Sequence, residues 1–162
     1  MLVRPLYKID DFQNLVSEVL KIMSEVSFEK NQIICQSLES DPDNWKVGIG
    51  SIEELEEQEE KKYCRLNSKL KDSYIEKLIN QHSAYRTRIM IMPPRQCYSV
   101  HADPSKRIHI PIITNNHCWM IWPYHAACHR LEIERAYLTD TTNPHTFING
   151  GTEDRIHIVM CV

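Results

Sequence analysis

Apolar positions in the first 84 residues recur mostly at helical spacing. Between about Asp11 and Met23, apolar side chains return every three or four positions, at Phe12, Leu15, Val16, Val19, Leu20 and Met23. This spacing predicts a helix with one core-facing stripe. A second helix is expected within "SKLKDSYIEKLINQH", with its buried side formed by Leu70, Tyr74, Ile75 and Leu78. Short strands are predicted at "RPLYKI" and "NQIICQSLE".

A run of charged residues lies between these elements. Ser51 and Glu54 have the spacing of a helix capping box, and the acidic run "EELEEQEEKK" begins beside them. Charges of mixed sign along a helix usually face water. The run is therefore interpreted as a solvated helix face.

From residue 85 the pattern changes to short apolar runs separated by turn residues. The predicted strands are "YRTRIMIM", "CYSVHA", "RIHIPIIT", "HCWMIW", "RLEIERAYL", "HTFIN" and "RIHIVMCV". Successive strands with no helix between them favour an antiparallel sandwich or small barrel, with the earlier helices packed against one sheet. The sequence predicts an α+β fold in one domain, residues 1–162, with a helical and mixed part at 1–84 and a β core at 85–162.

Composition narrows the classes of function. The chain has 162 residues, of which 42% are hydrophobic, enough for a single core. A net charge of −3 offers no basic field for nucleic acid or an anionic membrane, and no apolar run reaches the length of a membrane span. Acidic residues at 10 and 11 interrupt any signal peptide, and the six scattered cysteines favour reduced thiols. A cytoplasmic location is expected.

Candidate chemistry begins at "HAD", residues 101–103. In a strand, His101 and Asp103 would point to the same face while Ala102 points away. One imidazole and one carboxylate, joined by a second histidine, make the facial triad of non-haem iron(II), which leaves coordination positions open for oxygen and a substrate. The third ligand must come from elsewhere in the chain.

The segment "TDTTNPHTFINGGTEDRIHIVM" supplies a candidate histidine and an arginine. It is interpreted as a strand, a turn at Gly150-Gly151 and a second strand, which would bring Arg155 onto the neighbour of the strand that carries His145. A buried guanidinium needs an anionic partner and binds a carboxylate through two parallel hydrogen bonds. A cavity with a metal and an arginine suits a ligand with a chelating end and a distal carboxylate, such as 2-oxoglutarate.

The remaining histidines and tryptophans have simpler interpretations. A zinc site formed by His125, Cys128 and His129 with Cys118 is a weaker alternative, because their spacing matches no common closed site. The other histidines are interpreted as surface or hydrogen-bonded residues. Because Trp119 and Trp122 are three residues apart in one strand, at most one of them should face a cavity.

Three ordered motifs in this chain resemble a known family. They are "HAD" at 101–103, "RIHIPIIT" at 107–114 and "DTTNPHTFINGGTEDRIH" at 140–157. Together they resemble the aspartyl/asparaginyl β-hydroxylase family of iron(II)- and 2-oxoglutarate-dependent oxygenases, over about residues 85–162. Because the carboxylate at position 103 is present, the chain is more similar to the small bacterial-type members than to the animal aspartyl hydroxylases.

The resemblance implies a fold, a reaction and residue roles. The fold would be a double-stranded β-helix, a jelly roll of the cupin type. His101, Asp103 and His145 would ligate Fe(II), Arg155 would bind the distal carboxylate of 2-oxoglutarate, and Arg107 and His109 would approach its chelated end. With O2 as second co-substrate, the protein would hydroxylate an amino-acid or peptide side chain and convert 2-oxoglutarate to succinate.

Two other classes of function remain open from the sequence. A cupin-like metal-binding protein or isomerase would keep the metal ligands without using 2-oxoglutarate, and it would have no need for an inward arginine at position 155. A non-catalytic binding module could retain the barrel, although a complete triad argues against it.

Overall fold

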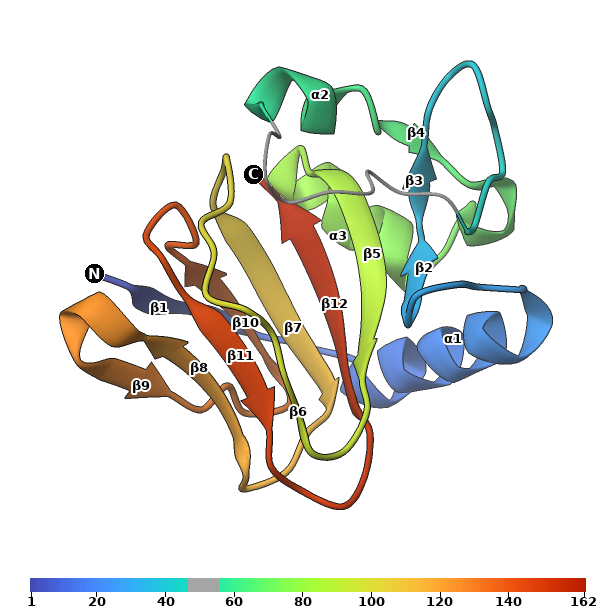
Figure 1. The fold of residues 1–162 in the computed structure, drawn as a ribbon. Coiled ribbons are helices and arrows are strands. Elements are labelled where there is room, and N and C mark those ends of the chain that lie inside the picture. Colours follow the sequence, from blue (N-terminus) through green and yellow to red (C-terminus); the bar gives the residue numbers. More distant parts are fainter. Residues whose placement is uncertain (47–55) are drawn as a thin grey trace.

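A computed structural model describes residues 1–46 and 56–162, and its larger sheet has six strands (Figure 1). The order is β1-β10-β7-β12-β5-β2, and every neighbouring pair is antiparallel. The strands are β1 (Val3–Lys8), β2 (Gln32–Ile34), β5 (Tyr85–Met92), β7 (Arg107–Ile113), β10 (Arg135–Thr139) and β12 (Arg155–Cys161).

A four-stranded antiparallel sheet faces part of the six-stranded one. Its order is β6-β11-β8-β9, with β6 (Gln96–Cys97), β8 (Cys118–Trp122), β9 (Ala127–His129) and β11 (Thr146–Asn149). An apolar cluster joins the two sheets and includes Met92 and Tyr137 from the larger sheet and Met120, Trp122 and Phe147 from the smaller one. A third, two-stranded sheet pairs β3 (Gln36–Ser37) with β4 (Arg65–Leu66).

The two faces of the six-stranded sheet differ in chemistry because side chains alternate along its strands. One face belongs to the main apolar core and carries Ile89 and Ile91 of β5, Ile108, Ile110 and Ile112 of β7, and Ile156, Ile158 and Met160 of β12. The other face carries Arg88, Arg107, His109, Arg155 and Val159, which line a cavity. Successive residues of each strand therefore alternate between the apolar core and the cavity.

Helices α1 (Phe12–Glu25) and α3 (Tyr74–His82) cover the apolar face, as the sequence predicts. The short α2 (Glu57–Lys61) contacts β5 instead, and 3-10 turns lie at Ser68–Leu70 and Pro123–His125. The Asp11 carboxylate accepts a hydrogen bond from the Asn14 amide at 3.3 Å and so caps α1. Within the described residues no helix is long and apolar enough to cross a membrane.

The predicted stripe of α1 is correct except at its C-terminal half. Phe12, Leu15 and Val19 are buried, but Leu20 is 45% exposed and Ile22 takes a buried position instead. In α3 and the turn before it, the predicted residues at 70, 75 and 78 are buried. The 3.6-residue period gives the direction of the stripe but not its edge, which depends on what packs there.

The interpretation of the acidic run as a solvated face is wrong at one residue. Most of α2 is exposed, but Glu60 has no exposed surface. Its carboxylate forms ion pairs with Arg86 and Arg107, the latter at 2.6 Å. A charged residue is buried in this way only when it is paired. The predicted capping box at Ser51 and Glu54 lies outside the described residues.

Two strand predictions differ from the structure. "NQIICQSLE" is divided, because β2 joins the six-stranded sheet and β3 pairs with β4. The expected hairpin between β11 and β12 does not form: β11 pairs with β6 and β8, whereas β12 pairs with β5 and β7. Neither Gly150 nor Gly151 has the positive φ that a two-residue hairpin turn favours, and the chain crosses from one sheet to the other.

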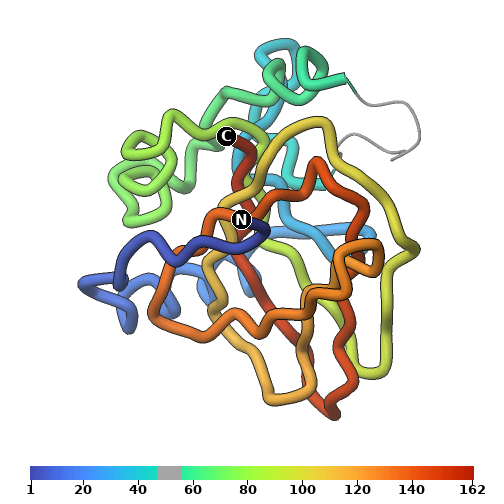
Figure 2. Tube along the Cα trace, turned by 90° about the vertical axis from the view of Figure 1, so that its left-hand side faces the viewer, coloured from blue at the N-terminus to red at the C-terminus, as the bar shows by residue number. Residues whose placement is uncertain are grey.

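The N-terminal part contributes both edges of the larger sheet. β1 pairs with β10 at one edge, and β2 pairs with β5 at the other. Figure 2 shows the blue N-terminal segment running beside the orange one in the turned view. The change in sequence pattern at residue 85 is therefore not a boundary between two separate sheets.

Candidate iron and co-substrate site

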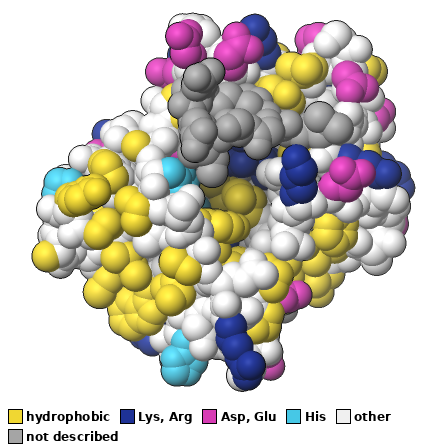
Figure 3. Space-filling view, viewed as in Figure 1, with side chains coloured by type: hydrophobic (Ala, Val, Ile, Leu, Met, Phe, Trp, Pro, Cys, Tyr) yellow, Lys and Arg dark blue, Asp and Glu magenta, His cyan; other side chains and the backbone are white. Residues whose placement is uncertain are grey.

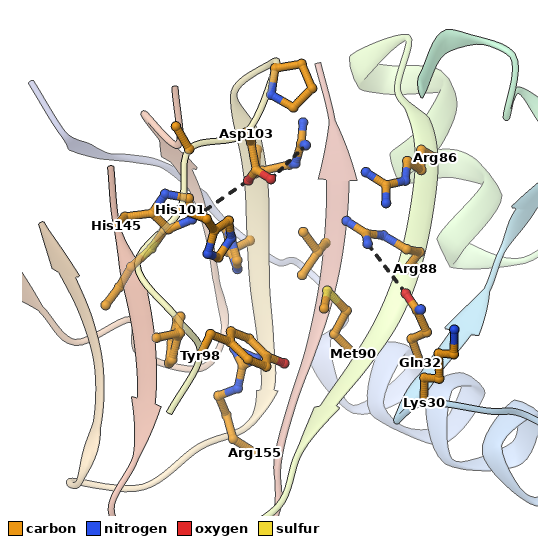
Figure 4. A pocket seen from close by; sticks show the side chains of 17 residues that line it. Lys30, Gln32, Arg86, Arg88, Met90, Tyr98, His101, Asp103, His145 and Arg155 are labelled. Carbon is orange, nitrogen blue, oxygen red and sulfur yellow. Dashed lines mark hydrogen bonds and ion pairs between the residues drawn. The ribbon is translucent and has the colours of Figure 1, made fainter. Parts of the chain in front are cut away.

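Three of the predicted site residues lie together. Within the described residues, the single group of three or more potential metal ligands consists of His101, Asp103 and His145, whose ligand atoms all lie within 4.8 Å of one another. His145 Nε2 is 3.8 Å from an Asp103 carboxylate oxygen, and the two imidazole centroids are 4.6 Å apart. Figure 4 shows these three side chains on one side of the cavity.

Backbone pairing holds two of these residues in place. His101 and His145 form an isolated antiparallel bridge, with amide-to-carbonyl distances of 3.0 and 2.8 Å. The Asp103 amide donates to the Thr141 carbonyl at 2.8 Å. The segment is thus an irregular extension and not the continuous strand that "CYSVHA" suggests. Ala102 also lines the cavity, so the predicted strict alternation fails there.

Both triad histidines are anchored through the ring nitrogen that faces away from the site. His101 Nδ1 lies 2.8 Å from the Ser99 carbonyl, and His145 Nδ1 lies 3.1 Å from the Asn143 carbonyl. A hydrogen bond of this kind fixes the tautomer and leaves Nε2 as the ligand atom. Burial lowers the pKa of His145, although the charge of Asp103 opposes this. The neutral imidazole that binds a metal is therefore favoured.

Asp103 is connected to a buried ionic network. One of its oxygens lies 3.3 Å from Arg107 Nη2, and Arg107 donates in turn to Glu60 at 2.6 and 3.1 Å. Ser105 also donates to Glu60, at 3.1 Å, and accepts a hydrogen bond from Arg107. Although Arg107 lines the cavity, it is already held by two carboxylates. Arg107 thereby orients Asp103 by contacting one carboxylate oxygen, while the other oxygen faces His145.

His109 lies deeper on the same face of the sheet. Its Nδ1 is 3.5 Å from that of His157, and burial lowers the pKa of both histidines well below the usual value, with the positive charge of Arg155 as the second cause. His109 lines the cavity, as predicted for a residue near the co-substrate. Both rings are neutral in the folded protein at neutral pH.

Arg155 points into the cavity without a carboxylate partner among the described residues. It is 1% exposed, and neither Nε nor Nη1 has a hydrogen-bond partner. Its guanidinium carbon lies 4.0 Å from the centre of the Phe147 ring, and burial lowers its pKa, while the interaction with the Tyr98 side chain, to which Arg155 donates, opposes this. A buried cation with unused donors matches an anionic ligand from outside the protein.

The cavity that unites these groups has a volume of about 220 Å³. Its walls come from both sheets and from the segment that carries the triad (Figure 4). The triad, Arg155 and the pair Arg107 and His109 therefore all line the same cavity.

Other sequence alternatives lie elsewhere. His125 is 3.2 Å from Asn143 and Cys118 is buried against Asn149, so the alternative zinc ligands are not brought together. Trp122 is fully buried, donates to the Asp140 carbonyl at 3.0 Å and lies 6.2 Å from the His145 ring. Trp119 is on the outer face beside Arg130. Neither tryptophan lines the cavity.

Sequence reasoning missed four charged residues at this site. Arg86 and Arg88 line the cavity from β5, Lys30 lines it from the segment before β2, and Glu60 reaches the back of the site from α2. A signal for Arg88 was available, because Arg86 and Arg88 stand two positions apart in the predicted strand "YRTRIMIM" and so would share one face. No comparable signal distinguishes Glu60 from its acidic neighbours.

The fold is similar to that of a hydroxylase of known structure. A truncated form of the viral collagen prolyl hydroxylase from Paramecium bursaria Chlorella virus-1 matches 100% of this chain and 91% of its own, with a TM-score of 0.52 and 10% identity. The complex of that enzyme with 2OG matches 54% of this chain and 68% of its own, with a TM-score of 0.39 and 10% identity. No curated protein sequence matches this chain.

The family of this chain is shown by a match of its sequence to a family model. The model of the aspartyl/asparaginyl beta-hydroxylase family matches residues 10–162. The chain belongs to this family. The match extends well beyond the segment 85–162 in which the motifs lie, and it includes the helices and strands of the N-terminal part that follow β1.

Proposed function

We propose that this protein is an iron(II)- and 2-oxoglutarate-dependent dioxygenase that hydroxylates an amino-acid or peptide side chain. The main support is that the triad and a buried, uncompensated arginine face one cavity. Membership of a family of hydroxylases agrees with this reaction. A peptide substrate would be in keeping with the collagen prolyl hydroxylase whose fold is similar.

The donor set fits ferrous iron. Two imidazoles and one carboxylate make the facial triad of non-haem iron(II), and the ligand atoms are close enough to share an ion. His101, Asp103 and His145 would hold the metal. The carbonyls at Ser99 and Asn143, together with Arg107 behind Asp103, supply the outer contacts that orient such ligands.

The other end of the cavity fits a dicarboxylate. Arg155 would bind the distal carboxylate of 2-oxoglutarate, because its unused N–H groups form a rigid fork in a buried site. His109 and Arg107 line the cavity between the two ends and would approach the chelated end. Neutral His109 can donate a single hydrogen bond there without adding charge.

The protein contributes binding and orientation to this reaction. When bound, iron and 2-oxoglutarate supply the oxidising chemistry: O2 is consumed, 2-oxoglutarate becomes succinate and CO2, and one oxygen atom enters the substrate. Burial keeps His145 and His109 neutral, and Arg155 would fix the direction of the co-substrate.

The same proposal covers the architecture. The two facing antiparallel sheets would be the halves of a double-stranded β-helix of the jelly-roll type, and residues 1–162 would act as one domain. In support, strands of the N-terminal part extend the sheet that carries the site.

Succinate formation tests the proposal. The iron-loaded protein should convert 2-oxoglutarate to succinate, and Arg155→Gln should lower turnover at a fixed co-substrate concentration by about 100-fold, since it removes a charge-assisted pair. Arg130→Gln, a surface change, is the matched control. A protein that binds iron but forms no succinate would instead support a cupin-like metal-binding protein or isomerase.

A further inference from the structure

Arg88 is a second buried cation on the cavity face without an ionic partner. Its residue is 8% exposed, and its Nε has no hydrogen-bond partner. The nearest polar group is the Gln32 side-chain oxygen, 3.5 Å from Nη1. Figure 4 shows Arg88 pointing into the cavity from the strand opposite the triad. No ion pair of Arg88 forms within the described residues.

The other arginines of the cavity are already accounted for. Arg86 and Arg107 both form ion pairs with Glu60, and Arg107 also contacts Asp103. Arg155 is assigned to the co-substrate by the proposed function. Burial and the neighbouring charge of Arg86 lower the pKa of Arg88 to about 10, so it stays protonated at neutral pH. A permanent, desolvated charge remains without a counterion.

Arg88 and Arg155 are too far apart to share one carboxylate group. In the register of β5 and β12, Arg88 lies opposite Val159 and Arg155 lies opposite Met92. Four strand positions separate Arg88 from Met92, which corresponds to about 13 Å along the sheet. The cavity thus has two cationic positions: Arg155 at one end, and Arg88 toward the other end, where Arg107 contacts Asp103.

The surroundings of Arg88 suit an anion that enters from solvent. Gln32 accepts from Arg88 through its oxygen, which leaves its amide N–H groups to donate. Lys30 is exposed and lines the same end of the cavity. Figure 3 shows a hollow in this face with Lys or Arg side chains at its rim. Arg88, Lys30 and the Gln32 amide group therefore offer donors or positive charge at this end, beside the apolar Met90 and Val159.

We propose that Arg88, with Gln32 and Lys30, binds a carboxylate of the molecule that is hydroxylated. This inference rests on the proposed function and defines its substrate as a carboxylic acid, whose reacting C–H bond lies between the bound carboxylate and the triad. The carboxylate belongs either to a free amino acid or to a side chain or terminus of a peptide. The guanidinium of Arg88 can donate two parallel hydrogen bonds to a carboxylate, whereas a neutral amide has only one oxygen to accept them.

Matched acids and amides test this site. The probes are free L-amino acids, their primary amides, and doubly capped aspartate and glutamate, which keep only a side-chain carboxylate. The measurement is substrate-stimulated succinate release by the iron-loaded protein. At least one acid should stimulate release, and its amide should require a concentration at least tenfold higher. Stimulation by a capped residue identifies a peptide source, and stimulation by free amino acids alone identifies a free one. Equal stimulation by acids and amides would overturn the proposal.

Variants separate Arg88 from the rest of the site. Arg88→Gln should raise the apparent KM for the stimulating acid at least tenfold. Arg130→Gln is again the control. Binding of the same acid to the metal-free protein, followed by saturation-transfer NMR, should weaken in parallel. Unchanged KM and unchanged binding in folded Arg88→Gln would overturn the assignment.

One substitution tests the site even if Arg88→Gln fails to fold. Gln32→Glu places a carboxylate beside Arg88, so it should raise the melting temperature and at the same time abolish acid binding. An unchanged melting temperature together with wild-type acid binding in Gln32→Glu would overturn the proposal. If no variant and no wild-type sample releases succinate from 2-oxoglutarate, the proposed function fails, whereas the NMR and melting experiments still decide the role of Arg88.

Discussion

The two faces of the six-stranded sheet are built from the same strands but have opposite composition. In β7, Ile108 and Ile110 face the helices, while Arg107 and His109 face the cavity. β12 repeats this with Ile158 on one side and Arg155 on the other. Alternation of side chains lets one strand carry a dry core on one face and uncompensated charge on the other. Stability and ligand binding are thereby divided between the faces.

This division makes the effects of substitutions separable. A change on the helix face should lower the free energy of unfolding and leave the ligand affinity of the folded fraction unchanged. A change on the cavity face should do the reverse. Glu60 is where this separation should fail, because it belongs to a helix yet holds groups of the cavity face.

The largest effect is expected from loss of a triad residue. His145→Ala should lower iron(II) affinity by more than about 100-fold, because even outer contacts of metal ligands contribute 10- to 100-fold. The free energy of unfolding of the metal-free protein should change by less than about 1 kcal/mol. Titration calorimetry under anaerobic conditions and urea unfolding measure the two quantities. His117→Ala, at an exposed position, is the control, and retained iron affinity in His145→Ala would contradict the assignment.

Glu60→Gln should affect both stability and the site. Removing this charge leaves Arg86 and Arg107 buried without their shared partner, a change that costs about 3 to 5 kcal/mol in comparable buried pairs. Because Arg107 then loses its anchor beside Asp103, iron affinity should fall as well. Urea unfolding and metal titration of the same sample measure both. Glu59→Gln, on the exposed side of α2, should change neither, and a wild-type unfolding curve for Glu60→Gln would contradict the network.

A core change should affect stability alone. Ile110→Ala removes a fully buried side chain between the sheet and the helices, which should lower the free energy of unfolding by about 3 kcal/mol. Iron affinity at temperatures where the variant is folded should equal that of the wild type. Leu20→Ala, at an exposed position of α1, serves as the control. A loss of iron affinity in folded Ile110→Ala would show that the two faces are not independent.

The smallest effect is a dependence of stability on pH. Burial lowers the pKa of His157 and His109 well below the usual value, so both are neutral when folded but become protonated in the unfolded chain below about pH 6.5. Their contribution is therefore complete above that pH and is lost as the pH falls. Each histidine contributes a slope of at most about 1.4 kcal/mol per pH unit.

Urea unfolding between pH 8 and 5 measures this slope. His157→Gln should reduce it, because one of the two titrations is removed. His117→Gln should leave the slope at the wild-type value, since this histidine is exposed. Parallel pH profiles for wild type and His157→Gln would contradict the buried, neutral state of this residue.

The long strands and the triad could be predicted from the sequence for physical reasons. β5, β7 and β12 are long enough for an unambiguous two-residue period. The triad was accessible because two of its ligands are only one residue apart, and because the resemblance linked them to His145 and Arg155. Their convergence on one cavity needed the structure.

Features that depend on distant partners could not be predicted. Glu60 is buried only because Arg86 and Arg107, far along the chain, lie where its carboxylate ends. The connection after β11 contains two glycines and therefore resembles a hairpin turn, but its path is decided by which sheet each strand joins. Gly151 is instead placed against Asn115, where a Cβ atom would lie 2.6 Å from the amide group.

The edge position of β1 has a consequence for how the chain folds. Lys8 pairs with Arg135, 127 positions later, so β1 has no partner until β10 has been made. Pairing over such a distance is slow, because a long loop must close before any contact compensates for the lost entropy. During synthesis the helix that follows β1 can form locally, whereas the sheet that carries the cavity can be completed only after β12 has been made.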